Sequence, residues 1–306
     1  MKKKDLILLA LCLALAVFGT VQLISHFSEE RAGRQREEQL RELWHAETVT
    51  AIPTLAPQRA AATAAPAPAE APAEAEEAPS APPVPSGPAE QKAARLKRSM
   101  YPGNPGLTVS ERFRALRKTN RDIVGWLSIG RMQDEAVTQR DNEFYMDHDA
   151  SGKKNVSGAL FLDENISLRM RPYALILYGH NMRDESRFGW LRKYENPDFY
   201  RSNRLIEFHT LYEEGRYVVF SEGRISTEEG DPDYLDFFCL SSLRTDERAQ
   251  AIGVLEQVSV LDSAVDVRVD DQILVLVTCM EKETDRRIVA ARRIRDGEDE
   301  TKFRNQ

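Results

Sequence analysis

A cysteine, a histidine and an arginine each stand where an apolar run of the sequence begins or ends. His180 follows one such run, Cys279 closes a second, and Arg287 opens a third after a short polar loop. A thiolate can attack a carbonyl carbon, an imidazole can transfer the protons, and a guanidinium can stabilise the oxyanion that forms. The three residue types therefore predict covalent catalysis by a cysteine, provided that the fold brings them together.

The runs around Cys279 and Arg287 are expected to pair as a β-hairpin, with the polar residues between them as its loop. Directly opposed residues of a hairpin have Cβ atoms about 5 Å apart. An arginine at that distance favours the thiolate form of the cysteine. A slip of one residue would place Arg286 on this face instead. We favour Arg287 because the residues that alternate with it, Val289 and Ala291, could line an inner face.

Each of these residues alone also has an ordinary structural interpretation. A cysteine is often a small buried hydrophobe, a turn histidine often bonds to the backbone, and most arginines are surface cations. His209 stands near another strand end and could take the place of His180. Of the three cysteines, Cys12, Cys239 and Cys279, the last two could form one disulfide. No histidines have metal-ligand spacing and no Cys-x-x-Cys motif occurs, so we expect no metal and no other cofactor.

The last 200 or so residues have the pattern of a mostly antiparallel β-barrel, because short apolar runs alternate with turn residues. A helix is expected first, from a capping box at Thr108-x-x-Glu111 to Gly125-Trp126. Residues 233–258 are expected to form a helical insertion before the cysteine strand. The clearest predicted strands are 159–162, 173–178, 217–220, 266–269, 273–278 and 288–294.

Composition divides the chain into four segments. Residues 1–27 carry three lysines before an uncharged run from Leu6 to Ile24, which predicts an uncleaved membrane anchor with its lysines in the cytoplasm. Residues 28–50 are charged and predict a juxtamembrane helix. Residues 51–100 are rich in alanine and proline and predict an extended linker that holds a domain away from the membrane. Residues 101–306 would be the extracytoplasmic catalytic domain.

The motifs of this last segment resemble those of the sortases, and among them class B. Leu276-Val-Thr-Cys279 is similar to the signature that ends in the nucleophile, and Arg287-Ile-Val289 resembles the arginine-bearing strand that follows. The resemblance extends over about residues 107–295 and includes the helical insertion. Further segments that resemble class B are Tyr178-Gly-His-Asn-Met182, Asp122 to Trp126, and Asp141 to Asp149.

The resemblance implies a closed sortase-like β-barrel and a transpeptidase with thiol endopeptidase activity. Cys279 would be the nucleophile, His180 the proton donor and Arg287 the oxyanion stabiliser. The implied substrates are secreted proteins with a C-terminal sorting motif, and the implied acceptor is an amine of peptidoglycan or of its lipid-linked precursor. The implied substrate-binding residues are Asn142, Met146 and Thr278.

Two other functions fit parts of the sequence. A different cysteine peptidase would place its cysteine at a helix N-terminus, whereas Cys279 closes a predicted strand. A non-catalytic, stalked surface or wall-binding module would explain the anchor and the linker equally well, and it predicts that Cys279 reacts no faster than Cys239. Nucleic acid is not an expected partner, because the formal net charge is −7.

Overall fold

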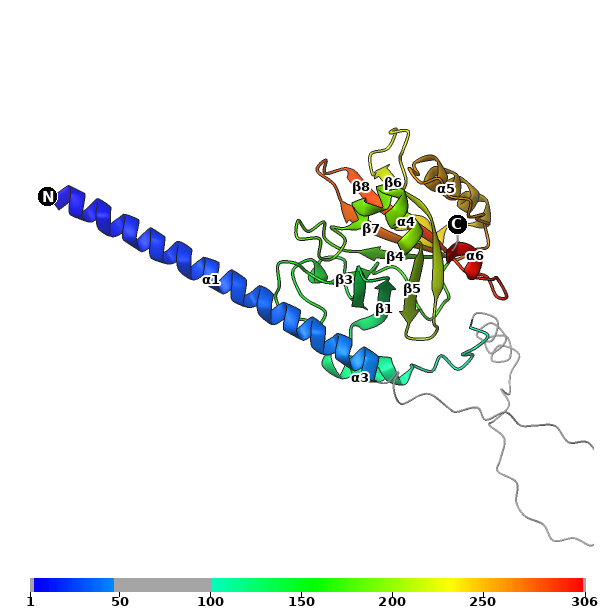
Figure 1. The fold of residues 1–306 in the computed structure, drawn as a ribbon, viewed down its shortest axis with the longest axis horizontal. Helices are drawn as coiled ribbons and strands as arrows, with labels where there is room; N and C mark the ends of the chain where they lie inside the picture. The colour runs from blue at the N-terminus through cyan, green and yellow to red at the C-terminus, as the bar shows by residue number, and fades with distance from the viewer. Residues whose placement is uncertain (1–2, 47–100, 305–306) are drawn as a thin grey trace, which may run out of the picture.

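Eight strands close into a barrel, and a long N-terminal helix leads away from it (Figure 1). The computed structural model describes residues 3–46 and 101–304, without some side chains in the first half of the N-terminal helix. The predicted linker at 51–100 therefore lies outside the described residues. The helices are α1 (Lys3–Ala46), α3 (Glu111–Thr119), α4 (Pro197–Asn203), α5 (Thr245–Gln257) and α6 (Thr301–Arg304), and the 3-10 helices are η1 (Phe144–Met146), η2 (Leu191–Glu195) and η3 (Phe237–Ser242).

The barrel has the order β1-β2-β3-β4-β7-β8-β6-β5 and is mostly antiparallel. The β2–β3 and β4–β7 pairs are parallel, and the other neighbours are antiparallel. The parallel β4–β7 pair matters for the site, because it brings the ends of two distant strands to the same edge. The strands are β1 (Ile123–Ile129), β2 (Gln133–Thr138), β3 (Leu160–Leu162), β4 (Ala174–Tyr178), β5 (Leu205–Thr210), β6 (Arg216–Ser226), β7 (Ile273–Cys279) and β8 (Asp285–Arg293).

The closed, mostly β architecture confirms the predicted fold class. Strand β7 shows why the apolar runs of the sequence indicated strands. Its residues Ile273 to Thr278 are all buried, because β7 lies between β4 and β8 and is covered on both faces. A strand buried on both faces appears in the sequence as a continuous apolar run. The burial ends abruptly at Cys279, which is exposed at the edge of the barrel.

Several predicted boundaries are wrong. The first helix ends at Thr119, so Gly125 and Trp126 belong to β1, and its N-cap is Ser110 rather than Thr108. Residues 266–269 form no strand, and β2 and β5 were not predicted. The insertion at 233–258 is not one helix but η3 followed by α5.

The end of α1 packs against the barrel, beside α3 (Figure 1). Leu40 and Trp44 are almost completely buried, and the Trp44 ring stacks on Trp126 of β1 with 4.9 Å between centroids. Stacked aromatic pairs of this kind add about 1 kcal/mol beyond the area that they bury. In the part of the chain that the structure describes, we find no helix with the length and apolar character needed to cross a membrane.

Candidate active site

The hairpin of β7 and β8 determines which side chains surround Cys279. In its register Cys279 lies directly opposite Arg286, and Thr278 lies opposite Arg287. Directly opposed residues of an antiparallel pair point to the same face of the sheet. Arg286 therefore shares a face with the thiol, and Arg287 points to the other face.

Cys279, His180 and Arg286 line one cavity of about 170 Å³ at the edge of the barrel. The β4–β7 register explains how His180 reaches it: Tyr178 pairs with Val277, so the two chains continue side by side beyond the strand ends. The loop after β4 is also held to the backbone of Cys279, because the Asn181 amide donates to the Cys279 carbonyl at 3.0 Å. The predicted convergence of thiol and imidazole is thus present in the fold.

The His180 ring is held by the backbone of η1. Its Nε2 lies 2.6 Å from the carbonyl oxygen of Met146. A carbonyl oxygen only accepts hydrogen bonds, so Nε2 is the nitrogen that carries a hydrogen in this contact. Among the other histidines, His209 stacks on Trp44 on another side of the barrel and does not line the cavity.

Arg287 is held on the other face of the hairpin by two carboxylates. Its Nη1 lies 2.7 Å from Glu195 of η2 and also donates to Glu222 of β6. Glu222 is completely buried, and this burial raises the pKa of its carboxyl to about 7, although the neighbouring Arg287 opposes the rise. Arg287 therefore has a strong local partner, whereas the hydrogen bonds of Arg286 go to the carbonyls of Glu283 and Asp285.

Cys239 of η3 and Cys279 of β7 differ in their neighbours. Both are exposed free thiols, so the disulfide that the sequence allowed is not formed. A hydrogen bond with Asp236 raises the pKa of the Cys239 thiol, and a carboxylate beside a thiol disfavours the reactive thiolate. Cys279 instead lies opposite a cation.

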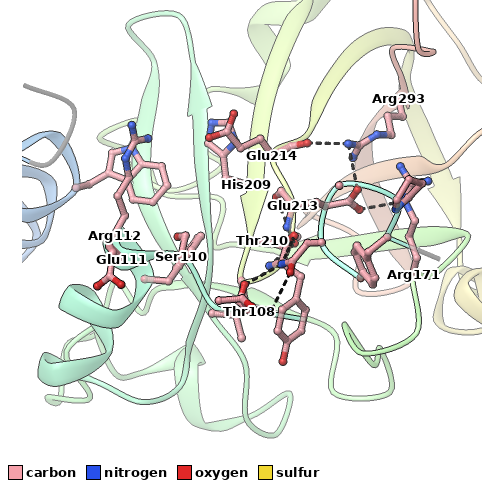
Figure 2. Close-up of a pocket in the computed structure, with 18 of the residues that line it drawn as sticks. Thr108, Ser110, Glu111, Arg112, Arg171, His209, Thr210, Glu213, Glu214 and Arg293 are labelled. Carbon is pink, nitrogen blue, oxygen red and sulfur yellow. Dashed lines mark hydrogen bonds and ion pairs between the residues drawn. The ribbon is translucent and has the colours of Figure 1, made fainter. Parts of the chain in front are cut away.

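A larger cavity, of about 590 Å³, lies near the end of α1 and has no thiol (Figure 2). Two of its arginines are paired within the chain: Arg171 and Arg293 both bind Glu213, at 3.2 and 3.1 Å. Figure 2 shows Arg293 also reaching Glu214, whose carbonyl accepts its hydrogen bond at 2.7 Å. The larger cavity therefore lacks the side chains that could carry out cysteine chemistry, whereas the smaller one has the thiol and the imidazole.

Comparisons with known proteins agree with this geometry. Sortase B of Staphylococcus aureus is 32% identical over 198 residues, which cover 61% of this chain and 75% of the relative. Sortase B of Listeria monocytogenes is 30% identical over 175 residues, covering 56% and 68%. The chain belongs to the class B sortases. It is thus a cysteine transpeptidase, and neither a different cysteine peptidase nor a non-catalytic surface module is favoured.

Solved sortase structures share the barrel. A Staphylococcus aureus sortase B–substrate complex superposes with a TM-score of 0.54 and 27% identity, covering 68% of this chain and 94% of that one. A Bacillus anthracis protein described as similar to sortase B gives a TM-score of 0.54 at 26% identity, covering 69% and 99%. A search of family models found no match.

The three predicted substrate-binding residues of this sortase also line the Cys279 cavity. Asn142 is fixed by Asp163, to which its amide donates at 3.2 Å, and Met146 is largely exposed. Thr278 is almost completely buried, and its hydroxyl donates to the Gly179 carbonyl at 2.7 Å. Thr278 therefore supports the turn that leads to His180, while Asn142 and Met146 form the walls.

The cavity also has an aromatic side, which the sequence did not predict. Phe161 and Tyr178 come from the barrel, and Phe237 and Phe238 come from η3 in the insertion. Phe237 and Phe238 pack together with 4.2 Å between ring centroids, yet Phe238 is still 48% exposed. The two adjacent phenylalanines were a usable signal, because exposed aromatics often mark binding surfaces.

Proposed function

We propose that Cys279 is the nucleophile of this sortase and that His180 is its proton-transfer partner. The supporting observation is that both line one cavity, at the ends of two strands that the parallel β4–β7 register holds side by side. The proposed substrates are secreted proteins with a C-terminal sorting motif, and the proposed acceptor is an amine of peptidoglycan or of its lipid-linked precursor. Sortase B structures have been solved with a substrate, for the Staphylococcus aureus enzyme, and with triglycine.

The proposed reaction has two halves. In the first, the Cys279 sulfur bonds to a carbonyl carbon of the sorting motif, and an arginine donates to the oxyanion. The carbon–nitrogen bond then breaks, His180 protonates the departing amine, and a thioacyl-enzyme remains. In the second half, the acceptor amine attacks the thioester, loses its proton to His180, and releases the Cys279 thiolate.

For the arginine we propose Arg286 rather than Arg287. Arg286 is supported by its position opposite Cys279 and in the cavity wall. The family motif favours Arg287, but this side chain would have to leave Glu195 and Glu222 and cross to the other face of the hairpin. Such a movement would break the hydrogen bonds to both carboxylates, one of which is completely buried.

We also propose that residues 1–27 anchor the enzyme in the cell membrane by a single pass, with the N-terminus in the cytoplasm and the barrel outside. The uncharged run from Leu6 to Ile24 supports this. Because α1 continues to Ala46 and its end packs on the barrel, the helix would hold the barrel near the membrane, rather than at the distance that the predicted linker alone would allow. From Ser25 to Gly33, where α1 lies against Asn155, the helix rises about 12 Å, at 1.5 Å per residue.

The test is incubation of the purified enzyme with a panel of sorting peptides and an amine, followed by mass spectrometry. We expect a thioacyl adduct on Cys279 and, with the amine present, a ligated product. Cys279→Ala should abolish both, whereas the matched control Cys239→Ala should leave both unchanged. An adduct that persists in Cys279→Ala, or that is lost in Cys239→Ala, would contradict the proposal.

A further inference from the structure

Arg187 is a buried arginine in the loop that follows His180. Its side chain is only 4% exposed, and its backbone has a φ of 52°, in the left-handed region. A non-glycine residue in that region costs about 1 kcal/mol, so other contacts must hold it there. Burial disfavours the charged form, but the carboxylates of Glu135 and Glu37 outweigh this and raise the pKa of Arg187 above its ordinary value.

The guanidinium of Arg187 joins three parts of the chain. Its Nη1 donates to Glu135 of β2 at 2.8 Å, and its Nη2 donates to Glu37 of α1. Its Nε lies 3.0 Å from the carbonyl oxygen of Gly158 and 3.2 Å from that of Ser157. A planar guanidinium with fixed donors is suited to such a junction, and a lysine could not satisfy all of these acceptors.

Two routes lead from this junction to His180. The first is the loop itself: Arg187 forms a β-bridge with Asn181, and the Phe188 amide donates to the His180 carbonyl at 3.0 Å. Asn181 in turn holds the Cys279 carbonyl. The ends of the loop that carries the catalytic imidazole are therefore joined beside Arg187.

The second route runs through the turn at Ser157 and Gly158. Gly158 lies so close to η1 that an added Cβ would be 2.5 Å from the Tyr145 carbonyl oxygen and 2.8 Å from that of Met146. The Met146 carbonyl is the group that holds the His180 ring. Arg187 thus fixes the turn that supports the hydrogen-bond partner of His180.

We propose that Arg187 and Glu37 are positioning residues for His180, so that the last turns of α1 belong to the catalytic unit. Glu37 lies 150 residues from Arg187 in sequence, and α1 supplies the carboxylate from outside the barrel. The inference rests on the proposed role of His180. Without Glu37, the buried guanidinium would keep one carboxylate and two carbonyls as partners. Arg187 would then hold the loop after His180 and the turn at Gly158 less firmly.

The experiment uses the full chain with Glu37→Gln, which keeps the shape and an acceptor oxygen but removes the charge. We expect kcat for sorting-peptide cleavage to fall by roughly tenfold, as for a small misplacement of a catalytic group, with KM changed little. The His180 ring signals in the NMR spectrum, identified by their absence in His180→Gln, should shift or broaden. Arg187→Lys keeps the charge but not the planar set of donors. It should lower kcat and change the His180 signals in the same way as Glu37→Gln.

Two controls separate positioning from simple stability. Glu38→Gln changes an exposed neighbour on the same helix, and Arg41→Gln loosens the docking of α1 at Asp134 without touching Arg187. Both should keep the wild-type kcat and His180 signals at temperatures well below their Tm. The inference is overturned if Glu37→Gln matches these controls, or if its only change is a lower Tm. If instead His180→Gln is as active as the wild type, the proposed role of His180 fails.

Discussion

The two faces of the β7–β8 hairpin carry neighbouring arginines with opposite surroundings. On the open face, Arg286 lies opposite Cys279 beside a cavity. On the held face, Arg287 lies opposite the buried Thr278 and binds Glu222 and Glu195. A single step of register therefore separates an arginine that lines the cavity from one that is paired with two carboxylates.

The largest effect is expected on the open face, from His180→Gln. Loss of a general acid typically lowers the rate by about 10²–10⁴-fold. The matched control is His209→Gln, because His209 lines the cavity of Figure 2 and should leave kcat/KM unchanged. Equal losses in the two variants would break the distinction between the catalytic cavity and the larger one.

On the held face, Glu222→Gln should change the pH dependence of stability. The pKa of Glu222 is raised from 4.5 to about 7, so between these values the unfolded chain releases a proton that the folded chain keeps. The stability present below pH 4.5 is therefore lost as pH rises through 7. At 1.36 kcal/mol per pKa unit, discounted for solvent screening, this loss is roughly 2 kcal/mol.

Glutamine does not titrate, so the variant should escape this loss. Chemical denaturation at a series of pH values would measure the free energy of unfolding of both proteins. Parallel pH profiles for Glu222→Gln and the wild type would show that Glu222 has no raised pKa in the fold. A large gain or loss of kcat in this variant would show that Arg287 takes part in the reaction.

The smallest effect is expected from Glu195→Gln. The Glu195 side chain is 55% exposed, and exposed ion pairs contribute at most about 1 kcal/mol. Thermal unfolding should therefore shift only slightly, and the shift should shrink further in high salt. A loss comparable to that of removing Glu222 would mean that the exposed carboxylate, and not the buried one, holds Arg287.

The sequence predicted the elements that are buried on both faces better than those that are polar on one face. The run at 273–278 was readable because β7 is enclosed, whereas β2 was missed because it carries Asp134 and Glu135. Those carboxylates bind His45 of α1 and Arg187, partners far away in sequence. The local sequence pattern does not show such distant partners. The half-polar strand β2 was therefore not distinguished from a loop.

The sequence predicted which strand ends come together, but not the register of the β7–β8 hairpin. Cys279 and His180 could be paired because each follows a run that must be a strand. The choice between Arg286 and Arg287 depends on how β8 begins, at Asp285, which accepts a hydrogen bond from Arg224 of β6 at 2.7 Å. That contact joins segments 61 residues apart, and the sequence gives no local sign of it.

The most direct test of the two-faced hairpin is the single-turnover rate of Cys279 acylation by a sorting peptide in two arginine variants. One is Arg286→Ala; the other is Arg287→Ala combined with Glu222→Gln, so that no buried carboxylate is left alone. We predict that Arg286→Ala slows acylation by about 10²–10³-fold, as for loss of an oxyanion donor, while the Arg287 variant retains most of the rate. A fast Arg286→Ala enzyme beside a slow Arg287 variant would contradict the account.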